Sequence, residues 1–270
     1  MATPTDALGI AHPPAAGEVR IVSLVPSLTE LLFDLGLGGQ VVGRTRYCVH
    51  PQPAVEAVPA VGGTKKVNRS RLLELRPSHL LVNVDENPRE LVESLAGSIP
   101  HVIVTHPNAP GDNPALYRLL GHIFHREPAA EALCERFDAA LERLRGVAMD
   151  LPPRRVLYLI WKAPWMTVSR DTYIARTLAL VGWETLGDDP ASRYPVVELD
   201  ARLLAAAELV LFASEPYAFG ERDLEEFRAD HPLCGARLLR LDAEMVSWYG
   251  SRAIRGLDYL AELARRVAEA

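Results

Sequence analysis

Short apolar runs alternate along the chain with segments of helical periodicity, and this order predicts α/β units. The runs that we predict to be strands are Arg20–Val25, Val41–Arg44, His79–Asn83, His101–Thr105, Arg155–Ile160, Glu208–Phe212 and Arg237–Leu241. Helices are predicted at residues 27–35, 68–75, 87–97, 114–124, 127–147, 171–182, 200–207 and from Ser251 to the C-terminus.

The segment from Glu127 to about Val147 is the longest predicted helix. Apolar residues recur along it at three- and four-residue steps, as on one face of a helix. At ~1.5 Å per residue this helix is about 30 Å long. A break in composition follows at Pro152 and Pro153, and the α/β pattern then restarts.

The expected fold is therefore α/β, with two Rossmann-like lobes joined by one long backbone helix. We place a flexible leader at residues 1–18, an N-terminal α/β lobe at 19–125, the linking backbone helix at 126–150 and a C-terminal α/β lobe at 151–270. In each half a helix carrying leucines leads into a strand (SRLLELRPSHLLV and DARLLAAAELVLF), which is compatible with a duplicated lobe.

Polar residues at the start of several helical segments predict N-caps. Ser27 and Glu30 have the S-x-x-E spacing of a capping box. Asn87, Asp171 and Asp200 stand at the starts of three further helices, and we expect each of them to cap its helix.

The composition is that of an ordinary globular protein, with 49% hydrophobic and 24% charged residues over 270 positions. A net charge of -6 and the lack of a basic run argue against a nucleic-acid partner. Three widely spaced cysteines, Cys48, Cys134 and Cys234, fit a reducing compartment better than a disulfide framework.

The first residues of the sequence show neither the basic region nor the apolar core of a secretory signal. No stretch approaches the ~20 apolar residues of a membrane span. We therefore expect a cytoplasmic protein without membrane insertion. The alternative is a periplasmic protein, if the start of the chain is misassigned.

The order of the motifs resembles a known superfamily from about residue 20 to residue 268. The matching stretches include RIVSLVPSLTELLFDLGLGGQVVGRTRYC, VGGTKKVNRSRLLELRPSHLLVNVDEN, the long helix, RVLYLIWKAPWMTVSRDTYIARTLALVG and VVELDARLLAAAELVLFASEP. Together they resemble the periplasmic-binding-protein-like superfamily with a helical backbone, the class III substrate-binding fold. Within it, the chain looks most like the branch described as cobalamin-binding or helical-backbone metal receptors. Members include cobalamin, iron-siderophore, haem and metal-ion receptors of uptake transporters. The resemblance implies a ligand cleft between the lobes and suggests an ABC transporter permease as partner.

Such folds bind ligand at the carboxyl ends of their strands, so the residues that follow each strand are candidates for the site. In the first half these include Tyr47, Cys48 and His50. A thiolate and an imidazole two residues apart in an extended segment point the same way and suit zinc or a similar metal. Glu86 could complete a metal set with them, and Lys65 could meet an anion. The alternatives are a half-buried cysteine, a loop histidine and an ordinary turn at Lys65.

The second half contributes aromatic and charged candidates. Trp165 follows a predicted strand and suits stacking on a flat ligand, the alternative being packing between the lobes. Glu215 follows the next strand. Trp248, Tyr249 and Arg252 lie at the start of the last helix, where clustered aromatic residues more often line a site or an interface than not.

These residues lead to three hypotheses for the function. The first is a binding protein for a small ligand, either a metal complex such as a cobalamin or a siderophore, or a metal ion, with no catalytic residue. The second is a cytoplasmic enzyme on the same fold, with Cys48 as nucleophile and His50 or Glu86 as its base. The third is a regulatory module that has lost its ligand. We favour the first, because no known catalytic motif is present. A cofactor is not identified; a metal ion or a corrinoid would be the ligand.

Overall fold

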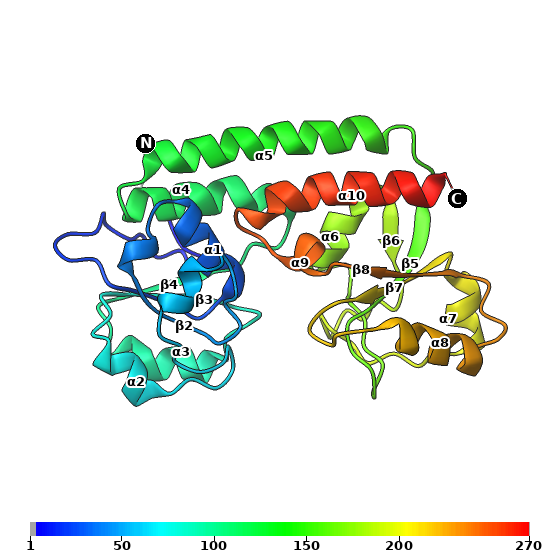
Figure 1. Cartoon of the computed structure of the whole chain (residues 1–270), viewed down its shortest axis with the longest axis horizontal. Helices are drawn as coiled ribbons and strands as arrows, with labels where there is room; N and C mark the ends of the chain where they lie inside the picture. Colours follow the sequence, from blue (N-terminus) through cyan, green and yellow to red (C-terminus); the bar gives the residue numbers. More distant parts are fainter. Residues whose placement is uncertain (1–3, 270) are drawn as a thin grey trace. The chain divides into compact units, whose positions relative to one another are not determined.

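The computed structural model describes residues 4–269 and divides them into two compact units. The first unit comprises residues 4–107, Gly111–Phe137 and Tyr249–Arg252. The second unit comprises Asn108–Pro110, Asp138–Trp248 and residues 253–269. Each unit contains one parallel sheet covered by helices, so the predicted α/β fold with two lobes is confirmed (Figure 1).

The sheet of the first unit has the strand order β2-β1-β3-β4. The strands are β1 (Ile21–Ser23), β2 (Val41–Arg44), β3 (His79–Asn83) and β4 (His101–Thr105), and all of them pair in parallel. Every residue of β3 is buried, as expected for a central strand covered on both faces. All four strands lie where the apolar runs predicted them.

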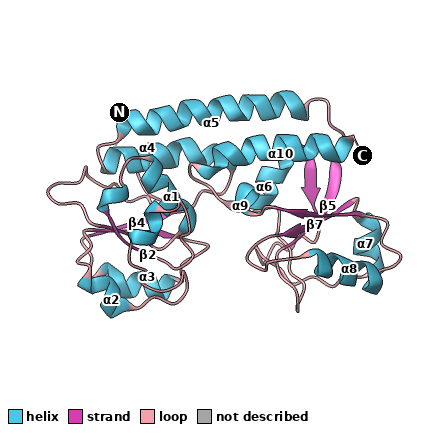
Figure 2. Ribbon diagram, in the orientation of Figure 1, coloured by secondary structure: helices cyan, strands magenta, loops and turns pink. Residues whose placement is uncertain are grey.

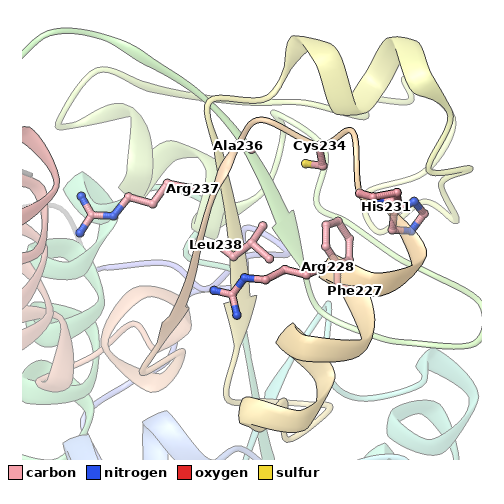
Figure 3. A pocket seen from close by; sticks show the side chains of 8 residues that line it. Phe227, Arg228, His231, Cys234, Ala236, Arg237 and Leu238 are labelled. Atoms are coloured by element: carbon pink, nitrogen blue, oxygen red, sulfur yellow. The ribbon is translucent and has the colours of Figure 1, made fainter.

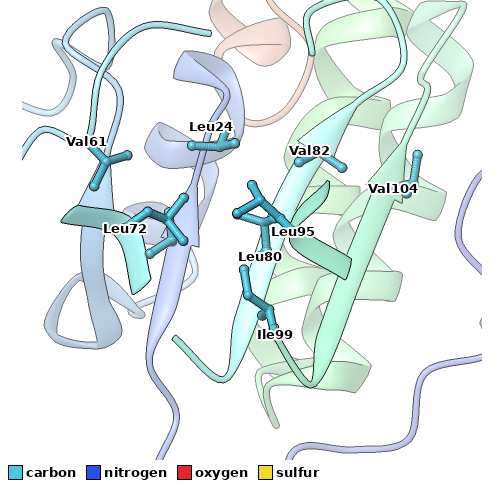
Figure 4. Close-up of a cluster of buried hydrophobic side chains, with 9 residues drawn as sticks. Leu24, Val61, Leu72, Leu80, Val82, Leu95, Ile99 and Val104 are labelled. Atoms are coloured by element: carbon cyan, nitrogen blue, oxygen red, sulfur yellow. The ribbon is translucent and has the colours of Figure 1, made fainter. Parts of the chain in front are cut away.

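Helices cover both faces of this sheet. Figure 2 shows α2 (Arg69–Glu74) and α3 (Arg89–Ala96) on one face, and α1 (Pro26–Asp34) and α4 (Asn113–Ile123) on the other. A cluster of buried aliphatic side chains fills the space under α2 and α3 (Figure 4). Leu72 of α2 and Leu95 of α3 are fully buried there against strand residues such as Leu80. Two short 3-10 helices, η1 (Gly38–Gln40) and η2 (Ala54–Ala57), flank β2.

The second unit repeats the same topology, with the strand order β6-β5-β7-β8. Its strands are β5 (Arg154–Leu159), β6 (Trp183–Thr185), β7 (Leu209–Ala213) and β8 (Arg237–Leu241), again all parallel. The helix-to-strand pairs that looked alike in the sequence occupy equivalent places, because α2 leads to β3 and α7 (Ala201–Ala206) leads to β7.

A second core lies under α7 and α8 (Glu221–Asp230), where Leu204 and Phe227 pack with Phe212 of β7. The remaining helices are α5 (Glu127–Ala148), α6 (Tyr173–Ala179), α9 (Glu244–Ser247) and α10 (Arg252–Ala268), with the 3-10 turn η3 (Pro110–Asp112) before α4. The long helix α5 begins and ends within one residue of the predicted range 127–147.

Several predicted helix caps are wrong, because the polar side chains have other partners. Val25 is the N-cap of α1, and no capping box forms, since Glu30 instead accepts two hydrogen bonds from Arg252. Asn87 does not cap α3, which begins after Pro88. Thr172 rather than Asp171 caps α6. The N-cap at Asp200 is confirmed, since its carboxylate accepts from the Leu203 amide.

One strand and two α-helices, and the short 3-10 helices, were not predicted from the sequence. Strand β6 and helix α9 contain three and four residues, so they offer too few positions for a period to show. Helix α8 has ten residues, of which only Leu224 and Phe227 are buried. Its other positions are mainly charged, which hid the apolar stripe.

The expected flexible leader is residues 1–18, of which residues 1–3 lie outside the described part of the chain. From Thr5, which forms a bridge with Ala11, the segment makes defined contacts. The Ala7 amide donates to the Val104 carbonyl at 2.8 Å, and the Val104 amide donates to the Asp6 carboxylate at 3.2 Å. The His12 ring lies 3.0 Å from the same carboxylate, and both side chains are buried. Since β4 is an edge strand, these bonds cover backbone groups that would otherwise be open to pairing with another chain.

Candidate ligand-binding site

The loops at the carboxyl end of the first sheet are held together by Asn87. Its side-chain oxygen accepts from the Asn83 amide at 2.9 Å. Its side-chain nitrogen donates to the carbonyls of Thr64 at 2.9 Å and Leu24 at 3.3 Å. One buried amide thus links the chain after β1, the Gly62-Gly63-Thr64 turn and the end of β3. We had expected Asn87 to be only a helix cap.

Cys48 lies beneath this edge and is fully buried. The Thr29 hydroxyl lies 3.1 Å from its sulfur, as does the Thr45 hydroxyl, and the Thr29 hydroxyl is also 2.9 Å from that of Ser23. Burial raises the pKa of the Cys48 thiol, although the hydrogen bonds from the two threonines oppose the shift. The thiol form is therefore favoured, which is unfavourable for both a nucleophile and a metal ligand.

The other candidates of the first half lie nearer the surface. The ring of Tyr47 is about half exposed, and the Arg46 guanidinium carbon lies 4.9 Å from its centre. His50 is half-buried and Lys65 is exposed. Val49 and Val84 are also exposed on the loops after β2 and β3. Together with Tyr47 they give this edge apolar surface.

Glu86, Tyr249 and Arg252 all lie in the first unit. The Tyr249 hydroxyl donates to the Glu86 carboxylate at 2.8 Å. Burial, followed by the negative charge of Glu86, raises the pKa of Tyr249 well above its ordinary value, so the ring stays neutral. Arg252 donates to both oxygens of Glu30, at 2.7 and 2.9 Å, and both side chains are buried. Arg252 is thus engaged with a buried carboxylate.

The carboxyl end of the second sheet carries an aromatic cluster. Trp165 stacks on Phe219 with ring centres 6.0 Å apart and planes 5° apart. Trp161 meets Tyr217 edge-on at 5.7 Å, and Tyr217 lies 4.5 Å from Phe219. The loops after β5 and β7 therefore share one aromatic surface. Of these four rings, that of Trp161 is the most exposed, at 39%.

Two polar groups brace the same loops. Lys162 forms ion pairs with Asp223, at 3.0 Å, and with Glu226 of α8. Glu215 accepts from the Ser247 hydroxyl at 3.0 Å and from the Trp248 indole nitrogen at 2.7 Å. Burial raises the pKa of the Glu215 carboxyl, while these two hydrogen bonds lower it. Trp248 itself is buried, so it braces Glu215 from below the surface.

The predicted site residues therefore fall into two groups. The first unit holds Tyr47, Cys48, His50, Lys65, Glu86, Tyr249 and Arg252, and the second unit holds Trp165, Glu215 and Trp248. Within residues 4–269, no group of three or more His, Cys, Asp or Glu side chains is arranged to hold a metal ion. Cys48, His50 and Glu86 are not brought together as a ligand set.

Several exposed apolar residues at these edges were not predicted from the sequence. Val84 and Val196 were not singled out, and Trp161 was ranked behind Trp165. Tyr217 was named as part of a loop without a role, yet it joins two loops. Their position directly after a predicted strand could have revealed them. An apolar side chain in such a loop lies outside the core, so it is expected to be exposed at the edge of the sheet.

Two α/β units of identical strand order, each with loops of polar and aromatic residues at its carboxyl edge, define the class of substrate-binding proteins. The model of the family described as periplasmic binding protein matches residues 21–234. The chain belongs to this family, and it is a binding protein for a small ligand.

Individual relatives agree with the family assignment. The vitamin B12-binding protein of Pectobacterium carotovorum is 26% identical over 200 residues, 73% of this chain and 72% of that protein. The structure of the periplasmic vitamin B12-binding protein of Vibrio cholerae matches with a TM-score of 0.79 and 20% identity, covering 93% of this chain and 97% of the other. A periplasmic heme-binding protein in complex with two hemes matches with a TM-score of 0.80 and 22% identity, covering 94% and 99%.

The expected cytoplasmic location is wrong, because the chain belongs to the periplasmic binding protein family and both matching structures are of periplasmic proteins. The odd cysteine count was a weak argument, since two of the three free thiols, Cys48 and Cys134, are buried and closed to oxidation. None of the helices in the described part of the chain combines the length and apolar content needed to cross a bilayer.

Proposed function

We propose that this protein binds a flat metal complex of the corrinoid or haem class and delivers it, in the periplasm, to an ABC transporter permease. The observation that carries the proposal is that the carboxyl-edge loops of each unit expose apolar side chains. Five of the nine large apolar side chains exposed in residues 4–269 stand there: Tyr47, Val49, Val84, Trp161 and Val196. Such surface suits the apolar face of a macrocycle, and the names of the relatives point to the same chemistry.

In this proposal, some side chains of each unit contact the ligand and others support the loops. Trp161, Trp165 and Tyr217 of the second unit offer ring faces to a planar ligand. In the first unit Tyr47 offers a ring, and Lys65 offers a charge to an acidic substituent. Glu86 and Glu215 carry hydrogen bonds that fix neighbouring loops, so they support the surface.

The burial of the Cys48 thiol argues against the enzyme hypothesis. Cys48 is closed to solvent, its pKa is raised by burial, and two threonine hydroxyls lie within hydrogen-bonding distance of its sulfur. A hydroxyl does not act as the general base that a catalytic cysteine needs. The same geometry disfavours Cys48 as a ligand of a bare metal ion.

Titration of the purified protein with cyanocobalamin and, separately, with haemin tests the proposal. Either ligand absorbs in the range of tryptophan emission, so binding quenches the fluorescence of nearby indoles. Trp161→Ala and Trp165→Ala should weaken binding by about tenfold to a hundredfold, as loss of an aromatic anchor usually does. Trp183→Phe is the matched control, because Trp183 of β6 is only 2% exposed and so cannot contact a ligand. Failure of the unmodified protein to bind either compound at micromolar concentration would refute the proposal.

A further inference from the structure

Three exposed cations lie on neighbouring loops at the carboxyl edge of the first sheet. Arg46 follows β2, and Lys65 and Lys66 stand in the turn that begins at Gly62. Between residues 44 and 67 the sequence contains four Lys or Arg and a single acid, whereas the whole chain has a net charge of -6. This part of the first unit is therefore positive in a protein that is negative on average.

The turn that carries the two lysines has a fixed backbone. The Arg46 amide donates to the Gly62 carbonyl at 2.8 Å, and the Gly63 amide donates to the Lys66 carbonyl at 2.8 Å. Gly62 has a φ of 131°, and a Cβ there would lie 2.5 Å from the Lys66 carbonyl oxygen, so this position requires glycine. The lysine side chains therefore start from defined positions beside the loop after β2.

Arg46 is held against the ring of Tyr47. Its guanidinium donates to the Tyr47 hydroxyl at 2.9 Å, and a Cβ on Gly63 would lie 3.2 Å from the same ring, so the turn packs against this pair. Among residues 4–269, no ion pair joins Arg46, Lys65 or Lys66 to a carboxylate. Three charges next to a half-exposed ring can therefore meet the acidic groups of a ligand.

The cations of the second unit are arranged differently. Lys162 already forms ion pairs with Asp223 and Glu226. At a cavity of about 570 Å³ near the amino end of β8, Arg237 points away from the apolar lining and donates to the Val267 carbonyl (Figure 3). Neither place offers several cations to one ligand, so the first unit is where acidic groups would be recognised.

We infer that the ligand carries ionised carboxylates at its edge and that Arg46, Lys65 and Lys66 bind them, with Tyr47 against its ring. The inference rests on the proposed function and narrows its ligand to porphyrin dicarboxylates, of which haem is one. The ring substituents of a corrinoid end in neutral amides, which would give the three cations no counter-charge. A guanidinium matches a carboxylate in shape as well as in charge, and a fixed turn lowers the entropy lost on binding.

The first experiment compares haemin with its bis-amide, in which both propionates are neutral amides while the ring and the iron are unchanged. Quenching of tryptophan fluorescence measures both affinities. The unmodified protein should bind haemin at least about tenfold more tightly, because the bis-amide cannot form charge-assisted hydrogen bonds. Added NaCl should weaken the haemin complex and leave the bis-amide complex unchanged. Equal affinities at low salt would overturn the inference and leave the proposed function standing.

The second experiment assigns the preference to its residues. Arg46→Gln, Lys65→Gln and Lys66→Gln combined should abolish the preference for haemin and change the bis-amide affinity by less than about twofold. The control variant removes the same charge at exposed positions outside the cluster and should keep the preference; its changes are Arg71→Gln, Arg76→Gln and Arg136→Gln. Circular dichroism confirms that both variants are folded.

The outcomes separate this inference from the proposed function. A preference for haemin that survives the loss of the three cations would overturn the inference. A preference that is lost equally in the control variant would also overturn it, because overall charge would then be the cause. If the unmodified protein bound neither haemin, nor the bis-amide, nor cyanocobalamin, the proposed function itself would be refuted, and the inference with it.

Discussion

The two sheets share one strand order, yet their carboxyl edges are stabilised by different chemistry. In the first unit, buried polar groups satisfy one another: the hydroxyls around Cys48, the amide of Asn87 and the ion pair of Glu30 with Arg252. In the second unit, stacked aromatic rings and the ion pairs of the partly exposed Lys162 hold the loops instead. Topology therefore fixes where the loops start, and the loop residues decide how they are held. A buried polar network is costly to break, because a lost member leaves its partners unsatisfied, whereas the partly exposed charges of the second edge can be lost at little cost.

Breaking the Glu30–Arg252 pair should give the largest effect. Arg252→Ala leaves the Glu30 carboxylate buried without its cation, which typically costs about 3–5 kcal/mol in the free energy of unfolding. Arg143→Ala is the matched control, because Arg143 makes a similar two-bond contact with Asp258 at side-chain exposures of 57% and 50%. Exposed pairs contribute roughly 0–1 kcal/mol. Urea unfolding measures both, and equal losses in the two variants would contradict the contrast between buried and exposed charges.

The buried histidines of the first unit should make it the more acid-sensitive one. Burial, followed by the charges of the neighbouring His101 and His12, lowers the pKa of His79 to about 4. His79 stacks on His101 at 4.7 Å and meets Phe124 edge-on at 5.0 Å, while His12 pairs with Asp6. Unfolded histidine binds its proton near pH ~6.5, so between ~6.5 and ~4 the unfolded chain binds more protons. Stability therefore falls as the pH falls through this window.

The size of this loss can be bounded. A pKa lowered from 6.5 to about 4 corresponds to a loss approaching about 3 kcal/mol by the lower end of the window. Urea unfolding at about pH 7.5 and pH 4.5 measures it. His79→Gln should remove most of the difference, and His125→Gln, at an exposed position, should leave it in place. If His79→Gln retained the full acid sensitivity, the histidine cluster would not be its source.

Asn87→Ala tests the polar edge at a neutral residue. The change removes hydrogen bonds to Asn83, Leu24 and Thr64 and leaves buried backbone groups without partners. A loss of about 1–3 kcal/mol is expected. Asn68→Ala, at an exposed helix cap, should cost ~1 kcal/mol and serves as control. Hydrogen exchange should show faster opening near Thr64 and Asn83 in the Asn87 variant, and unchanged exchange there would contradict its linking role.

The strands and most helices could be predicted because apolar runs and periodic faces are local features of the sequence. The wrong caps at Ser27, Asn87 and Asp171 share one cause, which is that their rules consider only neighbours in sequence. Glu30 has its partner 222 positions away and Asn87 has one 63 positions away. The loops of the candidate site could be predicted because they follow strands that local apolar runs reveal. The burial of Cys48 and Arg252 could not be predicted, because it depends on contacts that no local pattern contains.

Loss of the Lys162 charge should give the smallest effect. Its ion pairs with Asp223 and Glu226 involve side chains that are 15–41% exposed, and they raise the pKa of Lys162 while lowering those of both acids. Lys162→Met keeps the aliphatic stem near Trp165 and removes the charge, so the loss should stay below about 1 kcal/mol. Trp165→Ala is the contrasting variant, because it removes the partly buried stacked ring itself and should cost about 1.5–3 kcal/mol. A Lys162→Met loss as large as that of Trp165→Ala would show that the second edge, like the first, depends on its charges.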